Sequence, residues 1–265
     1  MKSIQLNNGV EMPKIGYGVY QIPPMMTQRC VKDAIEVGYR SIDTAQCYGN
    51  EKAVGKAIKN SAIPREDIFL TTKQWGSYGY RDTLASIDGS LKKLSVDYID
   101  LFLLHEPSGD NNERYRALED AQKAGKVRAI GLSNFLGDNY DNLLSNCQVI
   151  PQVNQIETHV FRQQNDFHNR MKVDGVVHES WAPMAEGQNG FFYNDTLTKI
   201  AQKYNRTVAQ VGLRWLYQKD IVVIPKSTHI ERMRENISIE DFELSLEDMK
   251  LIEQLDTGRS YFGWW

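Results

Sequence analysis

Four side chains that could move a proton stand at or just beyond the ends of short apolar runs. Asp43, Lys73 and His105 each close such a run, and Tyr48 follows Asp43 by five residues in a polar loop. The carboxyl ends of parallel strands meet on one face of a sheet or barrel. If the three runs are neighbouring parallel strands, these four side chains therefore share that face.

These residue types suit acid–base chemistry on a carbonyl or an alcohol. A free tyrosine has a pKa of about 10, and a nearby lysine ammonium lowers it by favouring the phenolate. We expect Lys73 to act on Tyr48 in this way, with Asp43 as the counter-ion of a partly buried Lys73. His105 could hydrogen-bond a substrate oxygen and orient it. Side chains cannot supply a hydride, so reduction implies a cofactor.

Polar or aromatic residues also end the later apolar runs: they are Ser133, Asn134, Gln155 and Trp181. The three polar residues offer the donors and acceptors that a carboxamide needs, and the tryptophan offers a flat face. A nicotinamide ring fits this set. Tyr20 and Trp75 could line the substrate pocket, although packing at the core or rim explains them equally well. Cys47 is interpreted as a packing residue rather than a redox-sensitive one.

A basic segment follows the last apolar run. Thr228 and Glu231 have the spacing of a capping box, which would place a helix N-terminus beside Lys226 and Ser227 as an anion site. Lys226 and Arg232 would add fixed charge around a phosphate. A phosphate held far from the reacting end favours NADPH over NADH. A solvated basic helix start is the alternative for this segment.

The composition limits the class of protein. The chain has 265 residues, 41% of them hydrophobic and 25% charged, with a net charge of −3. Such a balance is ordinary for a globular protein and gives no reason to expect nucleic acid or an anionic membrane as a partner. Three cysteines without CxxC spacing argue against a disulfide framework or a zinc site. No apolar run near the N-terminus is long enough for a signal peptide, so we expect a cytoplasmic protein.

Strand and helix patterns alternate along the chain after a predicted N-terminal hairpin, Ile4–Met12. The predicted strands are Ile15–Val19, Tyr39–Asp43, Ile68–Lys73, Ile99–His105, Val127–Ser133, Val149–Gln155, Val176–Trp181 and Ile221–Pro225. The predicted helices are Thr27–Val37, Glu51–Ile58, Tyr80–Leu94, Glu113–Ala124, Asp138–Leu144, Arg162–Val173, Thr207–Gln218, Ile230–Ile237 and Ser245–Leu255.

Eight such units predict one α/β domain over residues 1–265. We expect a (β/α)₈ TIM barrel with a hairpin cap and extra helices after the seventh and eighth strands. An open doubly wound sheet is the second interpretation. It usually has fewer units, and no G-x-G-x-x-G follows the first strand.

Several segments, in order and at compatible spacing, resemble the aldo-keto reductase family over nearly the whole chain. They are Ser41–Glu51, Thr71–Lys73, Asp100–His105, Gly125–Phe135, Pro151–Glu157 and Ile224–Ser227. The resemblance implies the barrel, NADPH-dependent interconversion of small aldehydes or ketones with alcohols, and a monomer. It implies Tyr48 as the proton donor, tuned by Lys73 and Asp43, with His105 orienting the carbonyl.

The resemblance also implies where the cofactor binds. Ser133, Asn134 and Gln155 would contact the carboxamide, and Trp181 would lie under the nicotinamide. The 2′-phosphate would meet Lys226, Ser227 and Arg232, and the adenine would meet Glu235 and Asn236. The loop Ala185–Gly190 would fold over the pyrophosphate.

Three departures from the family pattern concern the pocket. Glu106 stands where many members have an aromatic, Tyr20 where many have tryptophan, and Trp181 where tyrosine is common. The tryptophan favours bacterial reductases of small dicarbonyls and keto sugars. A tail that ends soon after Phe262, at Trp264–Trp265, suggests an open pocket and broad specificity. Two other functions remain open: a cofactor-binding regulatory or redox-sensing subunit, and an aldolase-like enzyme in which Lys73 forms a Schiff base.

Overall fold

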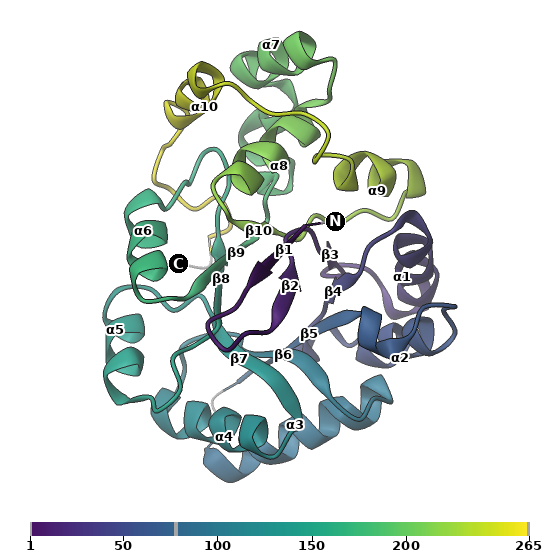
Figure 1. Cartoon of the computed structure of the whole chain (residues 1–265), viewed down its shortest axis with the longest axis vertical. Coiled ribbons are helices and arrows are strands. Elements are labelled where there is room, and N and C mark those ends of the chain that lie inside the picture. The colour runs from purple at the N-terminus through teal and green to yellow at the C-terminus, as the bar shows by residue number, and fades with distance from the viewer. Residues whose placement is uncertain (1, 77–78, 264–265) are drawn as a thin grey trace.

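Eight parallel strands form the centre of the computed structural model, which describes residues 2–76 and 79–263. The strands are β3 (Tyr17–Gly18), β4 (Ser41–Asp43), β5 (Phe69–Gln74), β6 (Ile99–Leu104), β7 (Val127–Ser133), β8 (Val153–Glu157), β9 (Val177–Trp181) and β10 (Val222–Val223). Their order in the sheet follows the chain, and every neighbouring pair is parallel. A parallel bridge between Ile15 and Val223 joins the two ends. The predicted (β/α)₈ barrel is confirmed (Figure 1).

The barrel closes through a close backbone approach. The amide of Gly16 donates to the carbonyl of Val223 at 2.8 Å, and the amide of Gly18 donates to Pro225 at 3.2 Å. A Cβ at Gly18 would stand 2.9 Å from the carbonyl oxygen of Ile224, closer than side chains tolerate. Glycine is therefore required at position 18, where the two ends of the sheet meet. Strand β3 is shorter than the predicted strand Ile15–Val19.

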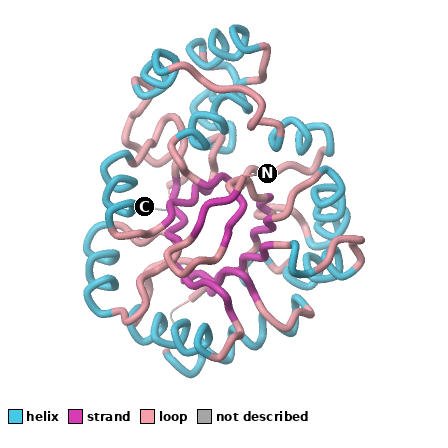
Figure 2. Tube along the Cα trace, viewed as in Figure 1, coloured by secondary structure: helices cyan, strands magenta, loops and turns pink. Residues whose placement is uncertain are grey.

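A two-stranded hairpin covers the amino end of the barrel. Strands β1 (Ser3–Gln5) and β2 (Glu11–Pro13) pair antiparallel and lie across the ring of strands in Figures 1 and 2. The side chain of Asn7 donates to the carbonyls of Pro151 at 3.0 Å and Gly175 at 3.1 Å, just before β8 and β9. The predicted hairpin cap is confirmed.

Helices surround the strands (Figure 2). They are α1 (Pro24–Val37), α2 (Glu51–Lys59), α3 (Tyr80–Leu94), α4 (Asn111–Lys123), α5 (Gly137–Asn146), α6 (Asn165–Val173), α7 (Asp195–Tyr204), α8 (Val208–Gln218), α9 (Ile230–Ile237) and α10 (Leu246–Glu253). Two helices follow β9 and two follow β10; the two after β10 and the second one after β9 were predicted. The capping box that starts α8 is present, because Thr207 accepts from the amide of Gln210 and the Gln210 side chain accepts from the amide of Thr207.

Helix α7 is absent from the sequence-based prediction. Its signals are in the chain: the Asn194 side chain caps the amide of Leu197, and Leu197, Ile200 and Ala201 form its buried stripe. The helix has only ten residues and lies between an irregular insertion and the stronger capping signal of α8. The prediction assigns no element to this segment.

The interior of the barrel is apolar at the hairpin end and polar at the other. The apolar cluster comprises Leu6, Met12, Phe69, Leu101, Leu103, Ala129, Val153 and Val222. Side chains of a strand alternate between faces, so Lys73 shares the inner face with Phe69, four residues earlier. Apolar side chains therefore fill the hairpin end of the barrel, and the polar side chains lie at its carboxyl end.

Among the described residues, no helix is both long and apolar enough to cross a membrane.

Candidate active site

A buried ion pair lies under the pocket at the carboxyl end of β4 and β5. The Lys73 side chain is 0% exposed, and its Nζ lies 2.5 Å from Oδ1 of Asp43. Lys73 also donates to the carbonyl of Thr44 at 3.1 Å. A fully buried ammonium requires such partners, because its desolvation is otherwise too unfavourable. The predicted counter-ion role of Asp43 has the geometry that it needs.

Tyr48 lies above this pair on a short 3₁₀ turn, η1 (Gln46–Tyr48), which follows β4. Lys73 Nζ is 5.2 Å from the centre of the Tyr48 ring, and the His105 ring is 5.7 Å away. Burial, and then the nearby Asp43 carboxylate, raise the pKa of Tyr48 well above its ordinary value. This direction is opposite to the predicted one, because burial of the phenol, and secondarily the Asp43 carboxylate, disfavour the phenolate.

His105 is kept neutral at the same place. Burial, with a smaller contribution from Lys73, holds the pKa of His105 well below its ordinary value. The thiol of Cys47 lies 3.6 Å from Nδ1 of His105, and desolvation raises the pKa of Cys47 to about 11. A thiol that retains its proton can donate to Nδ1, which leaves a hydrogen on Nε2 to donate to a substrate oxygen. Cys47 is exposed on the pocket wall rather than packed in the core.

A second buried acid belongs to this network and was missed by sequence reasoning. Gln155 Nε2 donates to Oδ2 of Asp43 at 3.0 Å and to Oε2 of Glu179 at 2.8 Å. Burial, and then the charge of Asp43, raise the pKa of Glu179 to about 8. The sequence did contain a signal for this buried acid, because Glu179 lies inside the predicted strand Val176–Trp181. The amide of Gln155 is already engaged by two acids.

One cavity of about 880 Å³ connects most of the predicted site residues. The predicted catalytic and substrate-binding residues that line this cavity are Tyr20, Asp43, Tyr48, Trp75 and His105. From the cofactor set, it is lined by Ser133, Asn134, Gln155, Trp181, Lys226 and Arg232. Lys73 lies beneath this lining.

Aromatic rings frame the reacting end of the cavity. The rings of Tyr20 and Tyr48 have centres 4.9 Å apart, and those of Trp75 and His105 meet edge to face at 5.1 Å. Both outer rings are partly exposed. The structure thus brings the two predicted substrate residues, Tyr20 and Trp75, directly against the two predicted catalytic ones.

Asn134 joins the wall of the cavity to two further residues. It has a φ of +62°, which asparagine tolerates better than most residues. Its Oδ1 accepts from Nε1 of Trp181 at 2.8 Å, and its Nδ2 donates to Oε1 of Glu106 at 2.9 Å. Trp181 and Glu106 therefore fix the orientation of the Asn134 amide.

Two exposed cations that follow β10 in the chain, Lys226 and Arg232, also line the cavity. Neither Lys226 nor Arg232 has an ion-pair partner within the part of the chain that the structure describes. Helix α9 begins after His229, which makes no side-chain cap, so the predicted capping box of Thr228 and Glu231 is wrong. The Ser227 hydroxyl instead accepts from the amide of His229 at 3.1 Å.

Three predicted cofactor residues do not line the cavity. Ser227 is buried, and its carbonyl accepts from the hydroxyl of Tyr17 at 2.5 Å. The carboxylate of Glu235 accepts from Thr207 at 2.7 Å, and Asn236 is 4% exposed. Their contacts with a nucleotide stay predictions.

The insertion after β9 walls the cavity on one side. It includes η3 (Ala185–Tyr193), in which Gly187 and Gly190 have φ of +78° and +65°. Gly187 and Phe192 line the cavity. The predicted loop Ala185–Gly190 is thus placed beside the site in a backbone conformation that its glycines favour.

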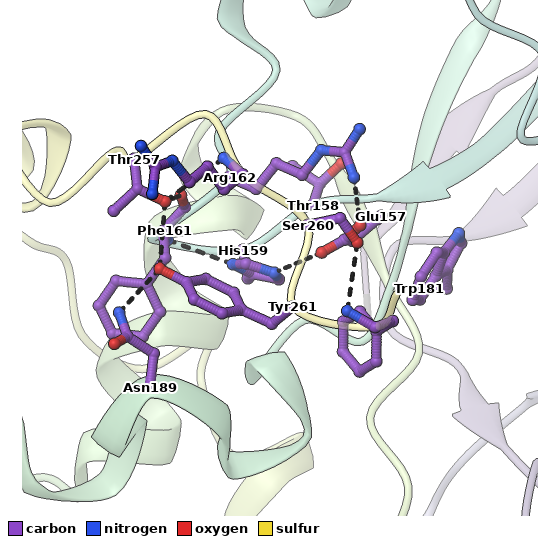
Figure 3. Close-up of polar contacts among 12 residues, drawn as sticks. Glu157, Thr158, His159, Phe161, Arg162, Trp181, Asn189, Thr257, Ser260 and Tyr261 are labelled. Atoms are coloured by element: carbon purple, nitrogen blue, oxygen red, sulfur yellow. Dashed lines mark hydrogen bonds and ion pairs between the residues drawn. The ribbon is translucent and has the colours of Figure 1, made fainter. Parts of the chain in front are cut away.

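The described part of the tail packs against this wall (Figure 3). Tyr261 accepts from the Asn189 side chain at 2.9 Å, and Thr257 donates to the carbonyl of Phe161 at 2.9 Å. The Phe262 ring lies 5.1 Å from that of Trp181. A tail that was expected to leave the pocket open therefore touches a residue that lines it; the predicted Trp264–Trp265 ending lies outside the described residues.

Comparison with known proteins defines the class. The chain belongs to the aldo/keto reductase family, whose model matches residues 9–257. Glyoxal reductase from Bacillus subtilis (strain 168) is 45% identical over 257 residues, covering 96% of this chain and 92% of that protein. Membership of this family makes the chain an oxidoreductase that acts on carbonyl groups.

Solved structures agree with this assignment. An aldo-keto reductase from a Medee basin deep-sea metagenome library matches with a TM-score of 0.96 at 45% identity, over 98% of this chain and 97% of that one. The Bombyx mori aldo-keto reductase in complex with NADP matches with a TM-score of 0.91 at 34% identity, over 97% and 93%. The family resemblance seen in the sequence is confirmed.

Proposed function

We propose that this chain reduces small aldehydes and ketones, dicarbonyls among them, to alcohols with NADPH, and that Tyr48 donates the proton. One observation carries the proposal: a single cavity is lined both by Tyr48 and His105 and by two exposed cations, Lys226 and Arg232. A dinucleotide needs such a site, with a reacting end and a separate phosphate end.

The lining suits a nicotinamide cofactor. Trp181 offers an aromatic face, while Ser133 and Asn134 offer hydrogen-bonding groups beside it. Exposed, unpaired guanidinium and ammonium groups are typical partners of a phosphate. Bound NADPH would supply the hydride, and the similar Bombyx mori enzyme is known in complex with NADP.

The protein's own groups would handle the proton. A raised pKa keeps the Tyr48 hydroxyl protonated at neutral pH, so that it can donate to a carbonyl oxygen as negative charge develops there. Lys73, 5.2 Å from the ring centre, would stabilise the tyrosinate that forms. Neutral His105 would donate from its ring to the same oxygen and orient it.

A Schiff-base role for Lys73 is disfavoured by its surroundings. A nucleophilic amine must lose its proton, whereas the Asp43 carboxylate at 2.5 Å favours the charged form. The proposal therefore gives Lys73 an electrostatic role and not a covalent one.

The test is NADPH oxidation, followed by absorbance, with glyoxal, methylglyoxal, an aromatic aldehyde, a keto sugar acid and a quinone. Turnover with NADPH, faster than with NADH, is the expected result. If no carbonyl is reduced while NADPH still binds, as judged by its fluorescence, the reductase assignment fails and a cofactor-sensing role takes its place.

A further inference from the structure

Glu106 is an acid in the cavity wall that has one buried oxygen without a hydrogen-bond partner among the described residues. It follows His105 directly at the end of β6 and lines the cavity. Its Oε1 accepts from Asn134 at 2.9 Å. Its Oε2 is buried and has no hydrogen-bond partner among the residues that the structure describes.

A buried carboxylate oxygen without a partner is uncommon in folded proteins and is unfavourable. Glu106 lines the cavity together with His105 and Asn134, and a donor held there would reach Oε2 once the carboxylate turns toward the cavity, since Oε2 itself is buried. The hydrogen bond from Asn134 to Oε1 is enough to position Asn134, so Oε2 is not needed for that positioning. A ligand with a hydrogen-bond donor at this place would satisfy it.

We propose that Glu106 determines substrate specificity, selecting carbonyl compounds that carry a hydroxyl donor next to the reacting carbonyl and disfavouring those that carry a carboxylate. This inference rests on the proposed carbonyl reduction. The geometry supports it because Glu106 neighbours His105, whose ring would orient the reacting oxygen. Both residues line one cavity, so a substrate whose oxygen contacts His105 could place a neighbouring group beside Glu106.

The protonation of Glu106 changes near neutrality. Burial raises the pKa of Glu106 to about 7, against the opposing effect of the hydrogen bond from Asn134. Below that pH the neutral acid can donate to a substrate carboxylate, and above it the anion repels one. Discrimination against carboxylates should therefore increase as the pH rises through 7.

The titratable groups around Glu106 keep the same charge near pH 7. On the turn after β4, Cys47 and Tyr48 have pKa values raised by burial, to about 11 for the thiol, and stay neutral. Neighbouring His105 is also neutral. From α4, Arg114 donates to the Glu106 carbonyl at 3.0 Å; burial lowers its pKa to about 10, so it stays charged.

Two buried groups lie deeper. Lys73 lies 2.5 Å from Asp43 and is 0% exposed, so it does not contact the cavity. Glu179, with a pKa of about 8, contacts Gln155 and does not line the cavity. Its titration persists in Glu106→Gln, so the difference between that variant and the wild type at each pH isolates the effect of Glu106.

The experiment measures kcat/KM with NADPH for three matched carbonyls: propanal, 2-hydroxypropanal and glyoxylate. The variants are Glu106→Gln, which removes the charge but retains an acceptor for Asn134, and Glu106→Leu, which removes both. Glu36→Gln, an exposed acid on α1, is the control for net charge. Circular dichroism of each variant checks that it is folded.

For Glu106→Leu, the ratio of 2-hydroxypropanal to propanal should fall roughly 10-fold, the value of one hydrogen bond to a charged group. For Glu106→Gln, the ratio of glyoxylate to propanal should rise roughly 10-fold at pH values above the Glu106 pKa. In the wild type that ratio should fall as the pH rises through 7, and in Glu106→Gln it should be flat. Glu36→Gln should leave both ratios as they are.

The outcomes separate the inference from the function on which it rests. If the wild type reduces propanal but neither ratio changes in the variants, Glu106 does not select substrates, and the reductase assignment stands. An equal change for all three carbonyls would mean that Glu106 acts only by positioning Asn134. If the wild type reduces none of the three, nor any carbonyl of the wider panel, both proposals are overturned.

Discussion

Two parts of the site differ in how their charged groups are paired. We call the surroundings of Lys73, Tyr48 and His105 the reacting end, and the part lined by Lys226 and Arg232 the phosphate end. At the reacting end, Lys73 is 0% exposed and lies 2.5 Å from Asp43, which also accepts from Gln155 at 3.0 Å. At the phosphate end, Lys226 and Arg232 are exposed and lack ion-pair partners among the described residues. One end is complete within the protein, and the other presents cations to whatever enters.

The difference follows from burial. A charge removed from water must be matched by the protein, so the reacting end holds its geometry without help from a ligand. A charge left in water needs no partner and gains one only when an anion binds. The protein can therefore preorganise the reacting end, while Lys226 and Arg232 would gain an anionic partner from the proposed cofactor.

The largest expected effect comes from the reacting end. Tyr48→Phe should lower kcat by roughly 10²- to 10⁴-fold, because the variant keeps the ring but loses the proposed proton donor. Steady-state kinetics with NADPH and methylglyoxal measure the loss. Tyr217→Phe is the matched control, since that hydroxyl bonds Glu240 at 2.7 Å, away from the cavity. If Tyr48→Phe retained most of its activity, the proton would come from another group.

Removing the buried counter-ion should affect stability. Asp43→Asn leaves the Lys73 ammonium without its carboxylate, and the free energy of unfolding should fall by about 3–5 kcal/mol. Urea denaturation measures the change. Glu36→Gln breaks an exposed pair with Lys32 at 3.5 Å, and should change stability by less than about 0.5 kcal/mol. Equal effects of the two substitutions would remove the distinction between the paired and the exposed charges.

Substitution at the phosphate end should change cofactor preference and leave stability unaffected. Lys226→Ala and Arg232→Ala should each raise the KM for NADPH roughly 10-fold, and the KM for NADH much less. Arg234→Ala is the control on the same helix, because Arg234 pairs with Glu231 at 2.7 Å and does not line the cavity. Equal losses with NADPH and NADH would place the 2′-phosphate elsewhere.

Sequence patterns predicted the arrangement of the reacting end because it depends on topology. Once parallel strands are recognised, Asp43, Lys73 and His105 must meet, since each ends a strand on the same face. The direction of the Tyr48 pKa could not be predicted, because it depends on burial in three dimensions. Glu179 was missed for the same reason: it acts through Gln155, on a neighbouring strand.

The phosphate end was predicted less completely. Lys226 and Arg232 line the cavity as expected, but Ser227 and Glu235 are occupied by other parts of the protein. Those contacts join residues far apart in sequence, such as Thr207 and Glu235. A local pattern can place a residue on a helix, but it does not say which neighbour the side chain will contact.

Glu106 combines features of the two ends. It is partly buried, and one of its oxygens has no hydrogen-bond partner among the described residues. Its pKa is raised from 4.5 to about 7 by burial, so the unfolded chain loses this proton at a lower pH than the folded one. The unfolded state therefore binds fewer protons between these values, and stability falls as the pH rises from about 4.5 to about 7, then levels off. Glu106→Gln lacks this titration. After allowance for solvent screening, it should be more stable than the wild type by about 1–2 kcal/mol above pH 7, and the advantage should vanish at low pH. Urea denaturation across this range measures the difference, with Glu36→Gln as the control. A difference that does not depend on pH would mean that the Glu106 carboxyl is solvated like the exposed charges at the phosphate end.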